Sequence, residues 1–180
     1  MNKKTICLLT SINALLWAFS FFYIGFTLKA LICSAFASIL TVVAYVDFKR
    51  KLIPDSAVLT LAALAVPYAL FMSGEPLSAH VIGAFVISAP FLALAFATGG
   101  MGGGDVKLMA AGGLFLGYKL AFISVLLGSV SGAAVSVFLL IKKKAGPKSE
   151  IAFGPFLALG LILALFFGNP LIDFYVSLFF

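Results

Sequence analysis

Long apolar segments separated by short polar turns run through nearly the whole chain. The predicted spans cover, in order, residues 6–26, 30–46, 56–72, 79–98, 106–116, 120–141 and 151–167. A helix needs about 20 apolar residues to cross a bilayer, and most of these segments approach that length. The polar turns between them are too short for a soluble domain. The pattern therefore predicts an all-α, polytopic membrane bundle of about seven transmembrane helices, with six to eight possible.

Composition supports the same class. The 180 residues are 63% hydrophobic and 10% charged, whereas soluble domains are about 45–50% apolar and about 25% charged. The net charge of +6 raises the question of nucleic acid. Lys and Arg, however, are clustered between the apolar segments, as expected for cytoplasmic loops of a membrane protein. We therefore expect contact with membrane lipids and no nucleic-acid partner.

The short apolar segment 106–116 decides the topology. If it spans the bilayer, every Lys and Arg except Lys29 and Lys119 faces the cytoplasm, in agreement with the positive-inside rule. If it is a re-entrant hairpin, the basic residues at 142–148 face outward. We therefore expect it to span. Because a helix from Asp105 to Tyr118 reaches only about 21 Å across a core of about 30 Å, either the bilayer is thinner there or neighbouring helices sheathe the segment.

The two ends of the chain differ from the central spans. Residues 1–29 resemble a secretory signal with a small-x-small site at Ala18–Ser20, but the apolar run continues past it, which favours an uncleaved first helix. The tail 169–180 is too short to cross alone, so we expect it at the interface or packed against the bundle. We expect a single integral-membrane domain over 1–180, with an extra helix over 1–29 and a core over 30–168.

A glycine-rich turn, Gly99-Gly100-Met101-Gly102-Gly103-Gly104, precedes Asp105 and Lys107. Glycine takes positive φ angles readily and allows another chain to approach the backbone closely. An ionisable group at a membrane segment is a candidate functional site. Asp47 ends the second predicted span and Asp105 begins the fifth, so both acids are expected at the cytoplasmic edge of the membrane.

Two carboxylates held within hydrogen-bonding range do not both ionise easily, because like charges repel. Such a pair shares a proton, so one carboxylate can deprotonate a water molecule while the other polarises a carbonyl group. That chemistry hydrolyses a peptide without a metal ion or a covalent intermediate. The alternatives are structural. Asp105 alone would complement the dipole at a helix N-terminus, and Asp55, beside Lys51, would serve as a salt-bridge or topology residue.

Three motifs carry a resemblance to a known family. Gly102–Asp105 fits the GxGD motif of membrane aspartic proteases. Asp47-Phe48-Lys49-Arg50-Lys51-Leu52-Ile53-Pro54-Asp55 combines an acid, a basic loop and Ile-Pro-Asp, and Phe153-Gly154-Pro155-Phe156 opens the last span. In this order and spacing, the motifs resemble those of type IV prepilin peptidases. The presenilin branch, which also has GxGD, is disfavoured because its Tyr-Asp and Pro-Ala-Leu motifs are missing.

The resemblance implies a function and a site. Asp47 and Asp105 would be the catalytic pair of an aspartic endopeptidase that removes the leader peptide of prepilins or pseudopilins at the cytoplasmic face of the bacterial inner membrane. No metal ion or cofactor is implied. Lys107 would influence the ionisation of Asp105, bind substrate or anchor its helix end. The residues expected to shape the site or contact substrate are Pro54, Asp55, Gly102, Gly103, Gly104 and Lys107.

Longer members of that family carry an N-terminal cytoplasmic region, often with paired CxxC motifs, that is linked to N-methylation of the trimmed pilin. Cys7 and Cys33 form no such motif, and we interpret both as small buried hydrophobic residues. The chain thus resembles the short, peptidase-only form found in Tad/Flp-type pilus systems, and no methyltransferase activity is expected.

The rival hypothesis is a non-catalytic membrane scaffold or small transporter with an inherited peptidase fold. A transporter places polar residues near the membrane midplane, on discontinuous helices, whereas both acids are predicted at one edge. His80, the single histidine, is interpreted as a polar loop residue on the outer side. Gly128 and Gly132, with small residues between them, predict close helix packing.

Overall fold

The computed structural model describes residues 3–98, 102–142 and 152–179. These residues form helices and turns without a strand. The helices are α1 (Lys3–Ile24), α2 (Leu28–Arg50), α3 (Asp55–Phe71), α4 (Leu77–Thr98), α5 (Gly103–Ile141) and α6 (Gly154–Phe179). Five of them, all except α3, are long and apolar enough to cross a membrane. The predicted all-helical membrane architecture is therefore confirmed.

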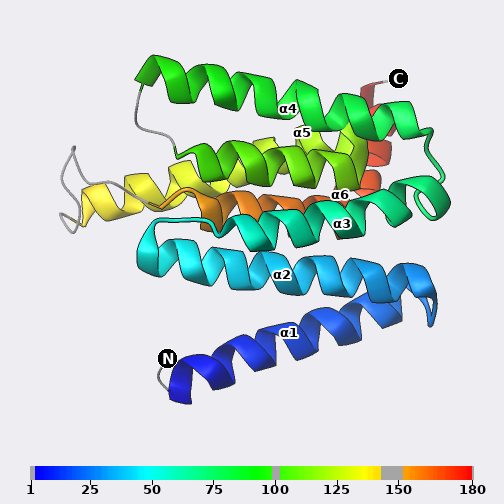
Figure 1. Ribbon diagram of the computed structural model, residues 1–180, viewed down its shortest axis with the longest axis horizontal. Coiled ribbons are helices and arrows are strands. Elements are labelled where there is room, and N and C mark those ends of the chain that lie inside the picture. The colour runs from blue at the N-terminus through cyan, green and yellow to red at the C-terminus, as the bar shows by residue number, and fades with distance from the viewer. Residues whose placement is uncertain (1–2, 99–101, 143–151, 180) are drawn as a thin grey trace.

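Helix α5 is two antiparallel segments joined by a break at Gly117, which has φ 78° and ψ 165°. Figure 1 shows the chain reversing there, so that residues 103–116 run beside α4 and residues 118–141 return to the end where α5 began. Counting α5 twice gives seven helical segments in the described chain, which agrees with the expected number. Each segment runs antiparallel to the one before it (Figure 1).

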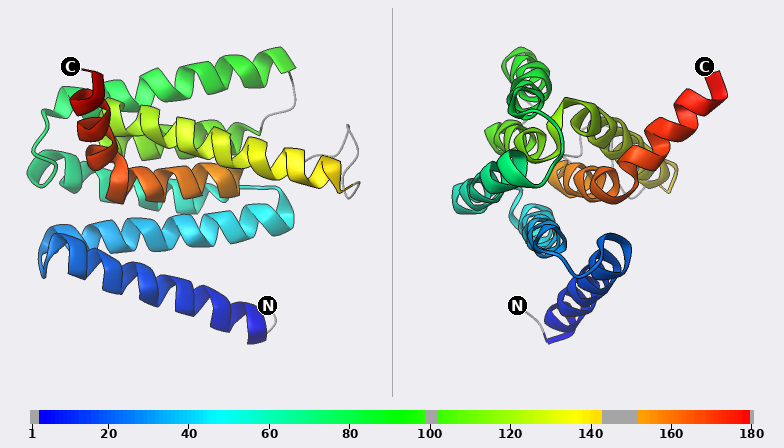
Figure 2. Two further views of the ribbon diagram at one scale, coloured as in Figure 1. Left: turned by 180° about the vertical axis from the view of Figure 1, so that it is seen from behind. Right: turned by 90° about the vertical axis from the view of Figure 1, so that its right-hand side faces the viewer.

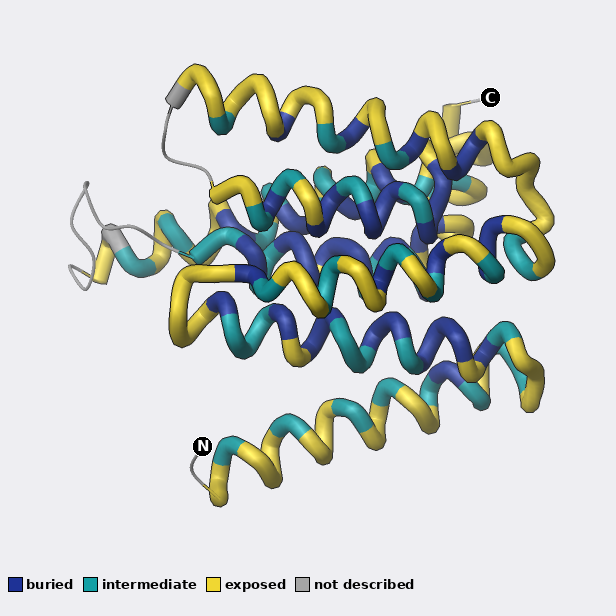
Figure 3. The backbone as a smooth tube through the Cα atoms, in the orientation of Figure 1, coloured by how far each residue is buried: buried dark blue, intermediate teal, exposed yellow. Residues whose placement is uncertain are grey.

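The first segment of α5 lies at the centre of the bundle. It packs against α3, α4 and α6. Figure 3 shows buried positions concentrated along it. Leu108, Met109 and Phe115 are fully buried. The Phe115 ring stacks on Phe36 of α2 at 3.8 Å and on Tyr68 of α3 at 4.1 Å between ring centroids. The expectation that neighbouring helices sheathe this short segment is confirmed.

Glycines allow the helices to pack backbone against backbone. An added Cβ at Gly83 of α4 would lie 2.6 Å from the Gly113 carbonyl oxygen of α5. At Gly128 of α5 it would lie 2.9 Å from the carbonyl oxygen of Phe156 in α6. At Gly160 it would lie 2.8 Å from the Gly128 nitrogen. The predicted packing role of the glycines in the second segment of α5 is confirmed, and a Cβ at these positions would force the helices apart.

The first helix and the tail lie at the edge of the bundle (Figure 2). Only Ser20 is buried in α1, and its hydroxyl donates to the carbonyl of Ala30 at 3.1 Å. The expected tail is the last part of α6, which contains Pro170 and turns away from the bundle (Figure 2). Its residues are mostly exposed, so of the two alternatives expected for the tail, packing against the bundle is wrong. A proline removes a helix hydrogen bond and favours such a bend.

The glycine contacts between α5 and α6 generate a prediction. Gly160→Ala should lower the free energy of unfolding by about 1–3 kcal/mol, because the added methyl group meets backbone atoms that have no rotamer to escape into. Thermal unfolding of the purified protein measures the effect. Leu159→Ala is the matched control, since Leu159 is 43% exposed on the neighbouring position of α6. An unchanged melting temperature for Gly160→Ala would contradict this packing.

Candidate active site

Four chain segments meet at one end of the bundle: the end of α2, the start of α3, the start of α5 and the start of α6 (Figure 1). Asp47 lies in the last turn of α2 and is 5% exposed, and Asp105 lies in the first turn of α5 and is 9% exposed. The two carboxylates are close enough to interact electrostatically. The acids that the sequence predicted at one edge are thus brought together, although they are distant in the sequence.

The loop after α2 returns the chain directly over the start of α5. Lys51 has a left-handed backbone, with φ 52°, and its N–H donates to the Asp47 carbonyl oxygen at 2.7 Å. Pro54 then precedes α3 as its N-cap residue with φ −66°, a value that its ring favours. Between them Ile53 is 5% exposed. Burial of Ile53, the apolar residue of the Ile-Pro-Asp motif, therefore fixes the loop against the start of α5.

Gly104 leaves the space into which the Ile53 side chain packs. An added Cβ at Gly104 would lie 2.9 Å from the Ile53 Cβ, whereas one at Gly103 would meet nothing within 4 Å. Gly103 and Gly104 have no positive φ, so of the two properties of glycine considered from the sequence, close approach rather than unusual backbone angles is used here. Gly104 is needed for close approach of the chain's own loop. Gly103 faces open space, and a Cβ at Gly102 would lie 3.9 Å from the Asp105 Oδ2, an ordinary van der Waals contact. Residues 99–101 of the turn lie outside the described residues.

Gly154, at the first position of α6, contacts Asp47 directly. Its backbone N–H faces the Asp47 carboxylate and favours the ionised form electrostatically, while the Asp47 Oδ2 is buried without a hydrogen-bond partner among the described residues. An added Cβ would lie 2.6 Å from the carboxylate Oδ2. Sequence reasoning recognised the Phe-Gly-Pro-Phe motif but did not assign Gly154 to the site. The signal was present, because Gly followed by Pro at a helix start leaves a backbone donor exposed for an anion.

Asp55 and Lys107 form an ion pair away from the buried acids. The Lys107 Nζ lies 2.7 Å from the Asp55 Oδ1, and both side chains are more than half exposed. The salt-bridge interpretation of Asp55 is confirmed, with Lys107 of α5 as a partner. Two residues of an α-helix span about 200° of rotation, so Lys107 projects from the opposite side of α5 to Asp105. The ion pair ties the start of α3 to the start of α5.

A groove of about 510 Å³ extends from this ion pair along the bundle. Its walls come from α3, α4 and the first segment of α5, and its lining is mainly apolar. The residues that line it are Asp55, Val58, Leu59, Ala62, Ala84, Lys107, Ala110, Ala111 and Leu114. Those from α3 and α5 are spaced three or four residues apart, so each helix contributes one face. The groove is wide because its walls carry alanines, and it follows the long axis of the helices.

The structure changes one further assignment. His80 belongs to the first turn of α4 and is 1% exposed, so the interpretation as a loop residue is wrong. It lies at the end of the bundle opposite the acids, where α4 begins (Figure 1). Within the described residues, no three His, Cys, Asp or Glu side chains are grouped so that they could hold a metal ion.

Comparison with known proteins gives consistent results. The model of the type IV leader peptidase family matches residues 34–137. The chain is 31% identical over 93% of its length to a prepilin leader peptidase/N-methyltransferase of Bacillus subtilis (strain 168), and covers 68% of that protein.

Two further relatives carry the same name. The protein of Xanthomonas campestris pv. campestris is 34% identical over 94% of this chain, which covers 60% of it. That of Aeromonas salmonicida (strain A449) is 33% identical over 77%, and the chain spans half its length. No solved structure matches the chain significantly.

The contrast between neighbouring glycines generates a prediction. Gly104→Ala should lower the free energy of unfolding by about 1–3 kcal/mol, because Ile53 must move from its buried position. Gly103→Ala, at an open helical position, should be neutral or should stabilise the fold by about 1 kcal/mol or less, since alanine favours helix. Thermal unfolding of both variants measures this, and equal destabilisation would show that Ile53 does not rest on Gly104.

Proposed function

Because the chain belongs to the type IV leader peptidase family, we propose that it is an aspartic endopeptidase that removes the leader peptide of prepilin-like proteins. The single observation that carries the proposed mechanism is the meeting of Asp47 and Asp105, both buried and within electrostatic range. In this proposal, residues 30–168 form the peptidase core, and α1 and the tail are additions to it. The proposed substrate class, prepilin-like proteins, follows from the family.

The acids act as a pair that shares one proton, because two neighbouring carboxylates do not both ionise easily. The ionised member removes a proton from water as the water oxygen attacks the scissile carbonyl carbon. The protonated member donates to the carbonyl oxygen, and collapse of the tetrahedral intermediate transfers a proton to the departing amine. Water is consumed and one peptide bond is broken, so no cofactor is required by this route.

The surrounding backbone holds the acids in position for that reaction. The Gly154 N–H interacts with Asp47, which fixes the orientation of one carboxylate. The open space at Gly103, and the lack of a side chain at Gly102 beside the Asp105 Oδ2, accommodate an extended peptide next to Asp105. The Asp55–Lys107 pair holds together the two helices between which, in this proposal, the substrate enters.

The groove between α3, α4 and α5 suits the apolar helix that follows the leader in such a substrate. Its lining is apolar along the length that lies within the membrane, so it can receive a helix directly from the bilayer. The groove ends at Asp55 and Lys107, on the opposite side of α5 from Asp105. The leader would therefore pass over the start of α5, across Gly102 and Gly103, to reach the acids.

The distribution of basic residues supports an orientation with the acids facing the cytoplasm of a bacterial cell. The ends of α1, α2 and α5 that lie on the acid side carry Lys3, Lys49, Arg50 and Lys142. The opposite end has Lys29 and Lys119, at the starts of α2 and of the second segment of α5. This asymmetry follows the positive-inside rule, and the membrane proposed is the inner one.

We propose peptidase activity without methyl transfer, although the relatives are named for both. The paired CxxC motif of the longer proteins is not present in this sequence, and Cys33 is buried in α2 while Cys7 is exposed on α1. The same assay tests both activities, because mass spectrometry of the trimmed product distinguishes a free N-terminus from a methylated one.

Substitution of either acid tests the mechanism. Asp47→Asn and Asp105→Asn should each lower the rate of leader removal by at least about a hundredfold, because each removes a proton-transfer group. The measurement is the gel shift and mass of a co-expressed prepilin, with membrane levels of each variant checked by blotting. Asp173→Asn is the matched control, since Asp173 is exposed on the tail of α6.

Trimming by both acid variants at the rate of the intact protein would rule out the paired-acid mechanism. Absence of trimming by the intact protein, with several prepilins that carry different leaders, would favour a non-catalytic scaffold. The Asp173 control separates a general effect of charge removal from a specific one.

Filling the groove tests the substrate path. Ala62→Phe should reduce the rate of leader removal about tenfold or more, because its ring occupies space needed by the substrate helix. Ala63→Phe should have no effect, since Ala63 is exposed on the next position of α3 and does not line the groove. Cleavage of a soluble peptide containing only the leader and the scissile bond should be equal in both variants. Equal cleavage of full-length prepilin by both variants would disprove docking in this groove.

A further inference from the structure

The tail of α6, residues 169–179, leaves the bundle at the end opposite the acids (Figure 2). In one view of Figure 2 it runs across the long axis of the other helices, and in the view along that axis it projects sideways from the bundle. Pro170 lies at the bend. Because the long axis of the helices is the direction in which they cross the membrane, the tail runs along the membrane surface rather than through it. The proposed peptidase chemistry does not use it.

The length of α6 explains why a straight helix would not suit the membrane. Its 26 residues would extend about 39 Å if straight, whereas the apolar core of a bilayer is about 30 Å thick. Leu171, Phe174 and Leu178, which are exposed in the structure, would then enter water. The bend at Pro170 keeps these residues at the level where the spanning part of α6 ends.

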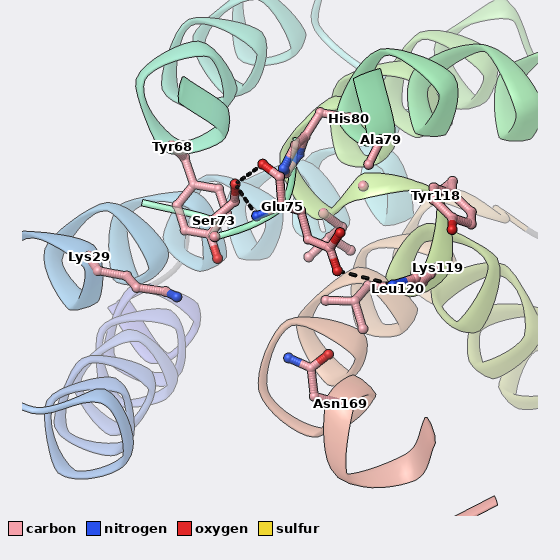
Figure 4. Close-up of a pocket in the computed structure, with 13 residues that line it drawn as sticks. Lys29, Tyr68, Ser73, Glu75, Ala79, His80, Tyr118, Lys119, Leu120 and Asn169 are labelled. Carbon is pink, nitrogen blue, oxygen red and sulfur yellow. Dashed lines mark hydrogen bonds and ion pairs between the residues drawn. The ribbon is translucent and has the colours of Figure 1, made fainter. Parts of the chain in front are cut away.

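Polar residues of the tail recur at every fourth position. Asn169, Asp173 and Ser177 therefore share one side of the helix. Asn169 lines a cavity of about 190 Å³ that is also lined by Lys119 and Glu75, and Figure 4 shows it on the side where α6 bends. Lys119 and Glu75 form an ion pair of 3.1 Å whose side chains are about half exposed. Because charges in hydrocarbon are costly, this ion pair marks a level that water reaches.

The opposite side of the tail is apolar. Leu171, Tyr175 and Phe179 each follow a polar residue of the tail by two positions, which is about 200° around the helix. All three are exposed, and the rings of Tyr175 and Phe179 lie 4.9 Å apart between centroids. The tail therefore has a polar side and an apolar side, and its apolar side is not covered by the described part of the chain.

Exposed tyrosines gather at the same end of the bundle. Tyr23 lies in the last turn of α1, Tyr118 follows the break at Gly117, and Tyr175 lies on the tail. These three are exposed, whereas Tyr45 and Tyr68 are not. Tyrosine is enriched at membrane–water interfaces, because its ring is apolar and its hydroxyl group is polar. Their positions therefore indicate that the tail lies at the level of the lipid headgroups.

We propose that the tail is an interfacial helix that anchors α6 in the lipid–water boundary of the leaflet opposite the acids. The side with Leu171, Tyr175 and Phe179 enters the lipid, and the side with Asp173 and Ser177 faces water. Such helices bury their apolar side about 5–10 Å into the boundary between headgroups and acyl chains. The surface bound is the bilayer itself, because the tail continues directly from a membrane-spanning helix. This placement does not depend on the proposed peptidase activity.

Cysteine accessibility in lipid nanodiscs, where both membrane faces are open to the reagent, tests the proposal. The full-length protein with Cys7→Ala and Cys33→Ala serves as the background for single cysteines. The variants are Asp173→Cys and Ser177→Cys on the polar side, and Leu171→Cys and Tyr175→Cys on the apolar side. A membrane-impermeant maleimide should label the polar-side positions at least about fivefold faster than the apolar-side positions, because lipid covers the latter.

Leu159→Cys is the matched control, because Leu159 is exposed on the spanning part of the same helix. It should be labelled as slowly as the apolar side of the tail. Tryptophan fluorescence then identifies what covers that side, in a background with Trp17→Phe. Fluorescence of Tyr175→Trp should be quenched more strongly by lipids brominated near the headgroup than by lipids brominated near the chain ends. Leu159→Trp should show the reverse order.

Equal labelling of all four tail positions would overturn the proposal, since the tail would then stand in water. Protection of all four, or the lack of quenching of Tyr175→Trp by either brominated lipid, would also overturn it, because a second copy of the chain would then cover the tail. Thermal unfolding identifies any variant that fails to fold, and the remaining position on each side then decides.

Discussion

The arrangement of this protein depends on keeping two carboxylates close together at a buried site at one end of the helix bundle. Burial of a carboxylate is unfavourable unless hydrogen bonds or a shared proton compensate for lost hydration. The Gly154 backbone N–H stabilises the Asp47 carboxylate electrostatically, and Asp105 lies in the first turn of a helix that begins with glycines. The ends of α2, α5 and α6 must therefore converge within a small space. Side chains at the contact points are small for that reason.

The glycines at this end act in two different ways. Gly104 and Gly154 are positions where a methyl group would collide with Ile53 or Asp47, so they determine how closely three segments approach. Gly102 and Gly103 are exposed, and an added Cβ would meet nothing within 4 Å at Gly103 and only the Asp105 Oδ2 and the Gly104 nitrogen, at 3.9 and 4.0 Å, at Gly102. A single glycine-rich stretch thus combines an internal packing requirement with an accessible backbone surface. The GxGD motif alone does not distinguish these two roles, which depend on the loop that carries Ile53.

Much of the architecture could be predicted from the sequence because membrane burial imposes a simple pattern. Apolar segment lengths gave the spans, and basic residues gave the topology that puts Asp47 and Asp105 at the same depth. The contacts that depend on three-dimensional packing were not predictable in this way. The pairing of Lys107 with Asp55, the groove beside them and the burial of His80 arise from how α3, α4 and α5 pack together, and no periodicity within one segment encodes this.

The break at Gly117 lies at one end of the bundle but affects the acid site at the other end. A continuous α5 of 39 residues would be about 58 Å long, nearly twice the apolar thickness of a bilayer. Gly117 adopts backbone angles that are essentially restricted to glycine, and His80 bonds to the carbonyl of Leu114 beside the break. The chain therefore returns to the acid end before α6 begins, which is what allows Gly154 to meet Asp47. A residue at the opposite end of the bundle is in this sense a condition for the acid site.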